Sequence, residues 1–156
     1  MSINKFIQEN LKVTPPAEDY SLMNHMLTSS KLPQIHCTDG FSMSVQVGYS
    51  LYCTPKKVAK RYSAVEIGYP SEHEPLIEEY AESFYDDGED VTDYTDTVYP
   101  YVPVKVVDKV LKKHGGIDLP ETSRRAKQHG LGPVKVKKNF RPGKLTEWGT
   151  PIQRKL

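Results

Sequence analysis

The chain has 156 residues, of which 37% are hydrophobic and 26% are charged, and its formal net charge is +1. This length suits one domain with a modest core. No run approaches the roughly 20 apolar residues that cross a bilayer, and the N-terminus lacks the features of a secretory signal. We therefore expect no membrane segment, and two cysteines favour reduced thiols over a disulfide framework.

The charges are segregated along the chain. Residues 66–98 contain twelve acidic residues and no lysine or arginine, whereas residues 117–156 contain ten basic and three acidic residues. The acidic middle and the basic end could pair within one molecule, between two copies, or with separate partners.

Two helices are predicted before residue 32. Ser2 can cap the first helix, and Thr14 and Pro15 end it. Its apolar stripe consists of Ile3, Phe6, Ile7 and Leu11. A second short helix is predicted over residues 17–27. We interpret residues 1–31 as a helical arm that docks on a sheet, in preference to a partner-binding helix.

A β-hairpin at residues 33–47 is the clearest pattern in the chain. Asp39-Gly40 is a strong turn signal. A three-residue turn closed by Gly40 at positive φ would pair Cys37 with Phe41, and Asp39 would cap that turn through its side chain. This register is favoured because it places four apolar side chains on one face. They are Ile35, Cys37, Phe41 and Met43.

After the hairpin, the strand either continues or bends at Gly48. Alternating hydrophobicity predicts a third strand over residues 62–69. The spacing of apolar residues then predicts a helix over 74–84, followed by an acidic loop that lasts until Asp96.

An irregular or edge strand is predicted over residues 97–102, because Pro100 cannot donate to a central ladder. A helix is predicted over 103–114, with Gly115 as its C-cap. Beyond residue 117 the pattern dissolves. The expected fold is α+β: a small antiparallel sheet packed by two helices in a core domain, 32–116, with the N-terminal helical arm and an extended or partly disordered basic C-terminal tail, 117–156.

Catalytic chemistry is not indicated. His36 and Cys37 would point to opposite faces of a strand, so Cys37 and Cys53 are interpreted as buried thiols and not as metal ligands. The acids of residues 86–90 do not match a calcium loop, and we expect a solvated acidic surface there, or one that imitates nucleic-acid charge. No nucleophile turn or phosphate loop is present. We predict no metal, no cofactor and no enzymatic activity.

Two groups of residues are candidate binding sites. The tail mixes basic and aromatic residues as nucleic-acid-binding arms do, although it could equally be solubilising or neutralise the chain's own acidic segment. Its candidates are Lys135, Lys137, Lys138, Arg141 and Trp148. The outer face of the sheet has a polar row that could receive a small anionic or nucleotide-like ligand, an ordinary solvated face being the alternative. That row consists of Ser42, Ser44 and Gln46, near Lys56, Lys57 and Arg61.

Four segments resemble a recurring set in small, uncharacterised proteins encoded by bacteriophages and prophages. They are IHCTDGFSMSVQ, YCTP, VEIGYPSE and DTVYPYVPVKVVDKVLKKHGG, within residues 32–116. The resemblance implies an accessory protein in the bacterial cytoplasm and carries over no catalytic residue.

The expected function is therefore non-enzymatic. We expect a phage accessory protein that binds and modulates a host macromolecule, most simply a host protein of defence or transcription, in the host bacterial cytoplasm. The alternatives are nucleic-acid binding through residues 117–156, a sponge for a small nucleotide signal, and a structural role in the virion.

Overall fold

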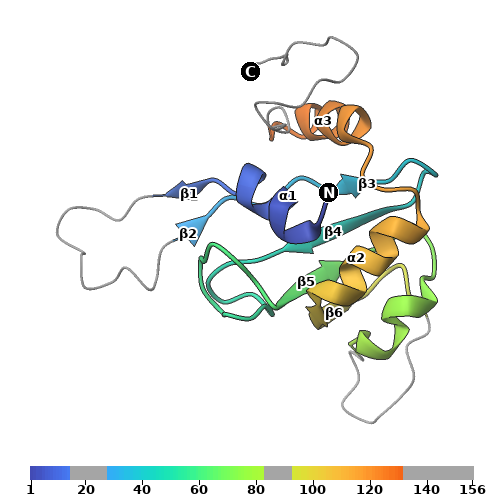
Figure 1. The fold of residues 1–156 in the computed structure, drawn as a ribbon, viewed down its shortest axis with the longest axis horizontal. Helices are drawn as coiled ribbons and strands as arrows, with labels where there is room; N and C mark the ends of the chain where they lie inside the picture. The colour runs from blue at the N-terminus through green and yellow to red at the C-terminus, as the bar shows by residue number, and fades with distance from the viewer. Residues whose placement is uncertain (15–27, 83–92, 132–156) are drawn as a thin grey trace, which may run out of the picture.

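A computed structural model describes residues 1–14, 28–82 and 93–131 (Figure 1). The elements in chain order are α1 (Ile3–Asn10), β1 (Val13–Thr14), β2 (Thr28–Ser29), β3 (Ile35–His36), β4 (Ser42–Gln46), β5 (Ala64–Gly68), the 3₁₀ helix η2 (Pro75–Tyr80), β6 (Val98–Pro103), α2 (Val104–Lys113) and α3 (Leu119–Gln128). None of the helices in these ranges is long and apolar enough to cross a membrane.

The fold is α+β, as predicted from the sequence. Strands β3, β4, β5 and β6 form an antiparallel sheet in that order, and β1 and β2 form a separate two-stranded ladder. Helices α1 and α2 lie on one face of the four-stranded sheet (Figure 1). Fully buried side chains of alternating strand positions face these helices and build the core. They include Met43, Val45, Val65, Ile67 and Tyr99.

The predicted hairpin register is confirmed. Ile35 pairs with Met43, and the Cys37 N–H donates to the Phe41 carbonyl at 2.8 Å. Gly40 has φ +97°, and Asp39 Oδ1 accepts from the Phe41 N–H at 2.9 Å, as expected of a capped turn. Strand β4 ends before Gly48, where a φ of +139° bends the chain.

Helices α1 and α2 confirm two predicted elements. Ser2 Oγ accepts from the Lys5 N–H and caps α1, whose apolar face is buried in the common core. The Ile3 N–H donates to Asp108 of α2 at 2.8 Å. The apolar core thus includes residues before position 32. The helix predicted over residues 17–27 lies outside the described residues.

The segment predicted as an α-helix over 74–84 contains a shorter helix of a different type. It forms the 3₁₀ helix η2, in which Ile77 is the buried residue. Glu74 caps its start, and the chain turns extended at Ala81. The Glu82 N–H then donates to the Val98 carbonyl of β6 at 2.8 Å. Pairing with the strand therefore replaces the predicted helix at Ala81 and Glu82, and residues 83 and 84 lie outside the described residues.

Helix α3 was not predicted from the sequence. Asp118 caps it by accepting from the Glu121 N–H at 3.0 Å. The buried Thr122 hydroxyl accepts from the His36 N–H at 3.0 Å, and the Asp118 N–H donates to the His36 carbonyl at 2.7 Å. Helix α3 thereby covers β3, the strand at one edge of the sheet.

Strand β6 is the other edge of the sheet and is irregular, as predicted. Val102 pairs with Val65 and Tyr99 pairs with Ile67, so two residues of β6 stand opposite Glu66. The second of these two, Tyr101, has a left-handed backbone with φ +54°. Bulges of this kind redirect side chains.

Candidate binding surface

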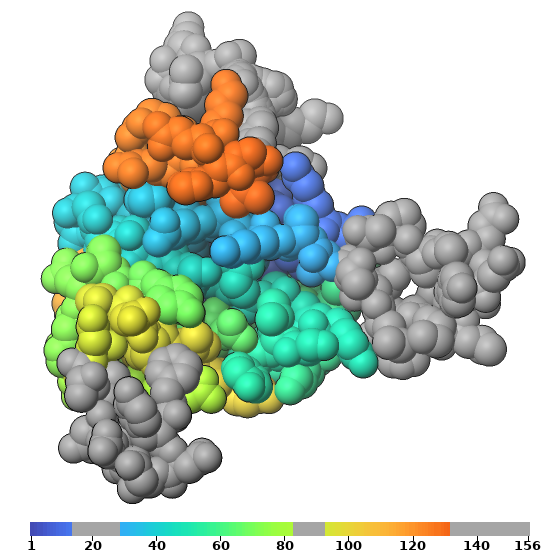
Figure 2. All heavy atoms as spheres, turned by 180° about the vertical axis from the view of Figure 1, so that it is seen from behind, coloured from blue at the N-terminus to red at the C-terminus, as the bar shows by residue number. Residues whose placement is uncertain are grey.

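The predicted polar row lies on the face of the sheet opposite α1 and α2, because its residues alternate with the buried side chains of β4. Figure 2 views the molecule from this side. Ser42, Ser44 and Gln46 are half-buried there. The Gln46 side chain accepts from the Leu32 N–H at 2.9 Å and donates to the Leu32 carbonyl and to Ser44 Oγ at 3.0 Å. Its amide thus holds the chain beside β4, so the row offers a ligand fewer free groups than the sequence suggested.

The other predicted binding residues cannot be placed on this face. Lys135, Lys137, Lys138, Arg141 and Trp148 lie outside the described residues.

Both cysteines are buried and free, as predicted. Burial raises the pKa of Cys37 to about 11, and burial also raises the pKa of Cys53. Such thiols are poor nucleophiles near neutral pH. Within 1–14, 28–82 and 93–131, no group of three or more histidine, cysteine, aspartate or glutamate residues is arranged to hold a metal ion.

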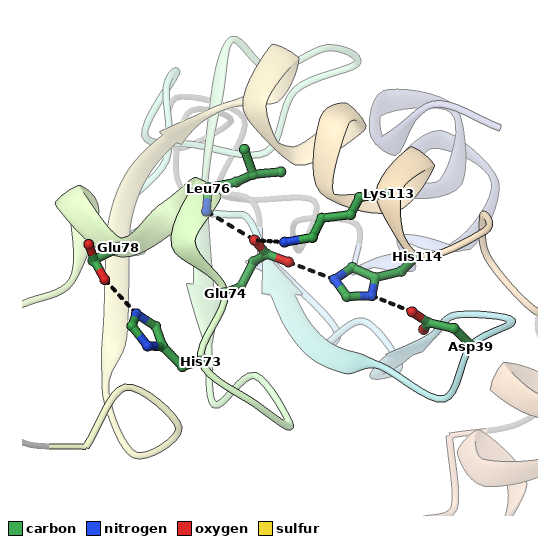
Figure 3. Close-up of polar contacts among 7 residues, drawn as sticks. All are labelled: Asp39, His73, Glu74, Leu76, Glu78, Lys113 and His114. Atoms are coloured by element: carbon green, nitrogen blue, oxygen red, sulfur yellow. Dashed lines mark hydrogen bonds and ion pairs between the residues drawn. The ribbon is translucent and has the colours of Figure 1, made fainter.

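A polar cluster under α2 joins three distant segments (Figure 3). We call it the His114 cluster: Asp39 of the hairpin turn, Glu74 before η2, and Lys113 and His114 at the end of α2. His114 Nδ1 lies 2.6 Å from Asp39 Oδ2, and Nε2 lies 2.6 Å from Glu74 Oε1. Lys113 Nζ donates to Glu74 Oε2 at 2.8 Å. The imidazole stacks on Phe41 with ring centroids 4.0 Å apart.

Electrostatics favour the charged forms of His114 and Glu74. Burial alone would lower the pKa of His114, but hydrogen bonds to Glu74 and Asp39 outweigh it and raise that pKa. Burial alone would raise the pKa of Glu74, but hydrogen bonds from Lys113, the Leu76 N–H and His114 lower it. An imidazolium between two carboxylates satisfies both ring nitrogens.

The His114 cluster is therefore suited to holding segments together. Because both ring nitrogens face carboxylates, neither is left to take a proton from a substrate. Backbone hydrogen bonds also connect the hairpin turn to the end of α2. The Asp39 N–H donates to the His114 carbonyl at 3.3 Å, and the Thr38 N–H donates to the Gly116 carbonyl at 3.1 Å. Sequence reasoning missed the cluster because His114 lies 75 and 40 positions from its two carboxylates.

A second feature lies at the surface and consists of Tyr52, Lys56 and Tyr101, which we call the Tyr52 patch. The two tyrosine rings have centroids 5.8 Å apart and are tilted by 53°. Lys56 Nζ lies 5.1 Å from the Tyr52 ring centroid, within cation–π range. The Tyr52 and Tyr101 residues are 39% and 44% exposed.

Backbone contacts fix the geometry of the Tyr52 patch. The Tyr101 N–H donates to the Tyr52 carbonyl at 3.1 Å, and the Tyr52 N–H donates to Glu66 Oε1 at 3.1 Å. Glu66 is the residue that the β6 bulge faces. The bulge and the patch are thus one structural unit, with Tyr101 in the left-handed conformation that tyrosine seldom adopts.

The segment that carries Tyr52 and Lys56 is an ordered loop, residues 48–63, which we call the basic loop. The Tyr62 hydroxyl donates to the Lys57 carbonyl at 2.9 Å and accepts from the Ala59 N–H at 2.8 Å. Asn4 of α1 exchanges two hydrogen bonds with the Tyr62 backbone. These contacts fasten the loop to α1 and the sheet.

Exposed tyrosine rings beside a cation are typical of surfaces that bind other macromolecules, because a tyrosine combines apolar area with a polar tip. No pattern in the sequence identifies either tyrosine as a binding residue. Their pairing depends on the bulge opposite Glu66, which no periodicity reveals.

Comparison of the chain with protein-family models, with curated proteins and with solved structures gave no match.

Proposed function

We propose that this protein is a non-enzymatic accessory protein, encoded by a bacteriophage or prophage, that binds a host protein in the bacterial cytoplasm through the Tyr52 patch. The observation that supports this proposal is that Tyr101, held in a left-handed backbone, places its exposed ring against that of Tyr52, over which Lys56 lies.

The strained backbone at Tyr101 lowers the stability of the fold, yet the protein has it. A left-handed backbone costs a residue with a Cβ about 1–2 kcal/mol. Glycine would fit a bulge that served only to bend the strand. Instead, the position carries a large aromatic residue that is 44% exposed and whose ring contacts Tyr52. Strained conformations of this kind gather at functional sites.

The test is affinity capture from lysate of the bacterial host, with the purified protein as bait. The test variant combines Tyr52→Ala with Tyr101→Asn, because asparagine tolerates the left-handed region and leaves the backbone in place. The matched control is Tyr69→Asn. Tyr69 is 52% exposed and has φ +50°, but it directly follows β5 and is not part of the Tyr52 patch.

We expect wild type and the Tyr69→Asn control to recover the same host protein, and the double variant to lose it. Recovery of the same proteins by all three baits, or of nothing above background by wild type, would contradict the proposal.

A further inference from the structure

We infer that the partner surface received by the Tyr52 patch is an acidic segment of a protein, whose carboxylates meet the lysines of the basic loop. This inference rests on the proposed binding function and adds the chemistry of the partner.

The charged side chains of the basic loop are all positive. Residues 40–65 include no aspartate or glutamate. The cations of the loop are all exposed: Lys56, Lys57, Lys60 and Arg61. Lys56 lies over the Tyr52 ring, so this positive charge is continuous with the aromatic surface. A segment that contacts the tyrosines therefore meets at least one ammonium group, and complementary charge favours carboxylates there.

The backbone of the basic loop is already ordered without a partner, and this favours binding. Gln8 of α1 donates to the Lys60 carbonyl at 2.9 Å, while Tyr62 holds the carbonyl of Lys57 and the N–H of Ala59. The cations therefore project from a backbone that is already fixed. Less conformational entropy is then lost on association than a free lysine-rich loop would lose.

The arrangement around the Tyr52 ring favours a protein partner over a nucleic acid. Single-stranded nucleic acid binds aromatic residues by stacking a base flat on the ring. Lys56 lies over the Tyr52 ring, and Tyr101 packs against it at a 53° tilt, so this ring offers little room for a base. Carboxylate side chains with neighbouring apolar groups fit the lysine and the tilted rings better.

The test measures fluorescence anisotropy of two labelled probes with the full-length protein. One probe is a peptide of glutamate and leucine residues, and the other is an oligothymidylate of equal net charge. The test variant combines Lys56→Glu with Lys57→Glu. The control combines Lys105→Glu with Lys109→Glu, two exposed positions of α2, so that both variants have the same net charge.

We expect wild type and the α2 control to bind the peptide with similar affinity, and the basic-loop variant to bind it about tenfold more weakly or worse. Raising the salt concentration from about 50 to 300 mM should weaken peptide binding by wild type, because a shorter Debye length screens the attraction between the lysines and the carboxylates.

Equal peptide binding by the two variants, or tighter wild-type binding of oligothymidylate than of the peptide, would overturn the inference. Host-protein capture that still depends on Tyr52 and Tyr101, with no peptide binding, would overturn the acidic partner and leave the proposed binding function standing.

Discussion

His114→Gln tests whether the His114 cluster contributes to stability in the way its geometry indicates. His114 is 6% exposed and lies 2.6 Å from a carboxylate on each side. Glutamine has a similar size and can still donate one hydrogen bond, but it carries no charge and cannot stack on Phe41 as the imidazole does.

The magnitude follows from what the substitution leaves behind. Glu74 is 1% exposed, and removal of one partner from a buried ion pair typically costs about 3–5 kcal/mol. Lys113 and the Leu76 N–H still contact Glu74, so we expect the lower end, about 3 kcal/mol. Loss of the ring stack adds up to about 1 kcal/mol. A total near 4 kcal/mol is a large part of the roughly 5–15 kcal/mol that stabilises a typical domain.

The pH dependence has a defined sign. Folding raises the pKa of His114 above its ordinary value of 6.5, so its contribution is complete below pH 6.5 and is lost as pH rises through the raised pKa. Folding lowers the pKa of Glu74 and Asp39 below 4.5 and 3.8, so their contributions are present above those values and are lost as pH falls through the lowered pKa. Stability from the cluster is therefore greatest between pH 4.5 and 6.5.

Urea unfolding at a series of pH values measures both effects. We expect His114→Gln to lower the free energy of unfolding near pH 6 and to remove the decline of stability above it. His73→Gln is the matched control, because His73 also lies 2.6 Å from a carboxylate, Glu78, but both side chains are 46% exposed. That exposed pair should contribute under about 1 kcal/mol. A loss in His114→Gln no larger than in His73→Gln, or an unchanged pH profile, would refute the reasoning.

Three further substitutions test other contacts by urea unfolding and hydrogen exchange. Gly115→Ala should destabilise clearly more than Gly116→Ala: both glycines have φ near +87°, but an added Cβ at Gly115 would lie 2.0 Å from Thr38 Oγ1, whereas at Gly116 nothing lies within 4 Å. Equal losses would show that Thr38 moves aside freely. Thr122→Val should cost about 2 kcal/mol by leaving a backbone N–H of β3 without its acceptor, while Thr122→Ser should restore most of it; a valine variant as stable as wild type would contradict this role. Tyr62→Phe should speed amide exchange at Ala59, since the hydroxyl is its acceptor; unchanged exchange would mean that the loop is ordered by other contacts.

Local rules predicted the parts of the fold whose signals are local. The hairpin register followed from the period of a strand together with a turn that needs a positive φ at Gly40. Helix α2 followed from Pro103, the valine spacing and Gly115. In each case the residues that form the element also specify where it begins and ends.

Features that depend on distant contacts were not predicted. Helix α3 buries Thr122 and Ala126, which make no strong apolar stripe, and its position depends on hydrogen bonds to His36. The His114 cluster and the Tyr52 patch each require segments that are remote in sequence to be adjacent. The left-handed Tyr101 contradicts the ordinary preference of its residue type, so no local rule would place it.

The two edges of the sheet differ in how they are kept from pairing with other molecules. An open edge strand offers its free N–H and C=O groups to any extended chain. Strand β6 interrupts its own ladder with Pro100 and the bulge, whereas β3 relies on α3, which occupies the N–H and C=O of His36. A chain shortened to residue 116 would therefore keep its core strands but gain an uncovered edge, and we expect it to self-associate. Self-association of that shortened chain in sedimentation velocity, with a monodisperse full-length protein, would show that residues 118–128 protect this edge.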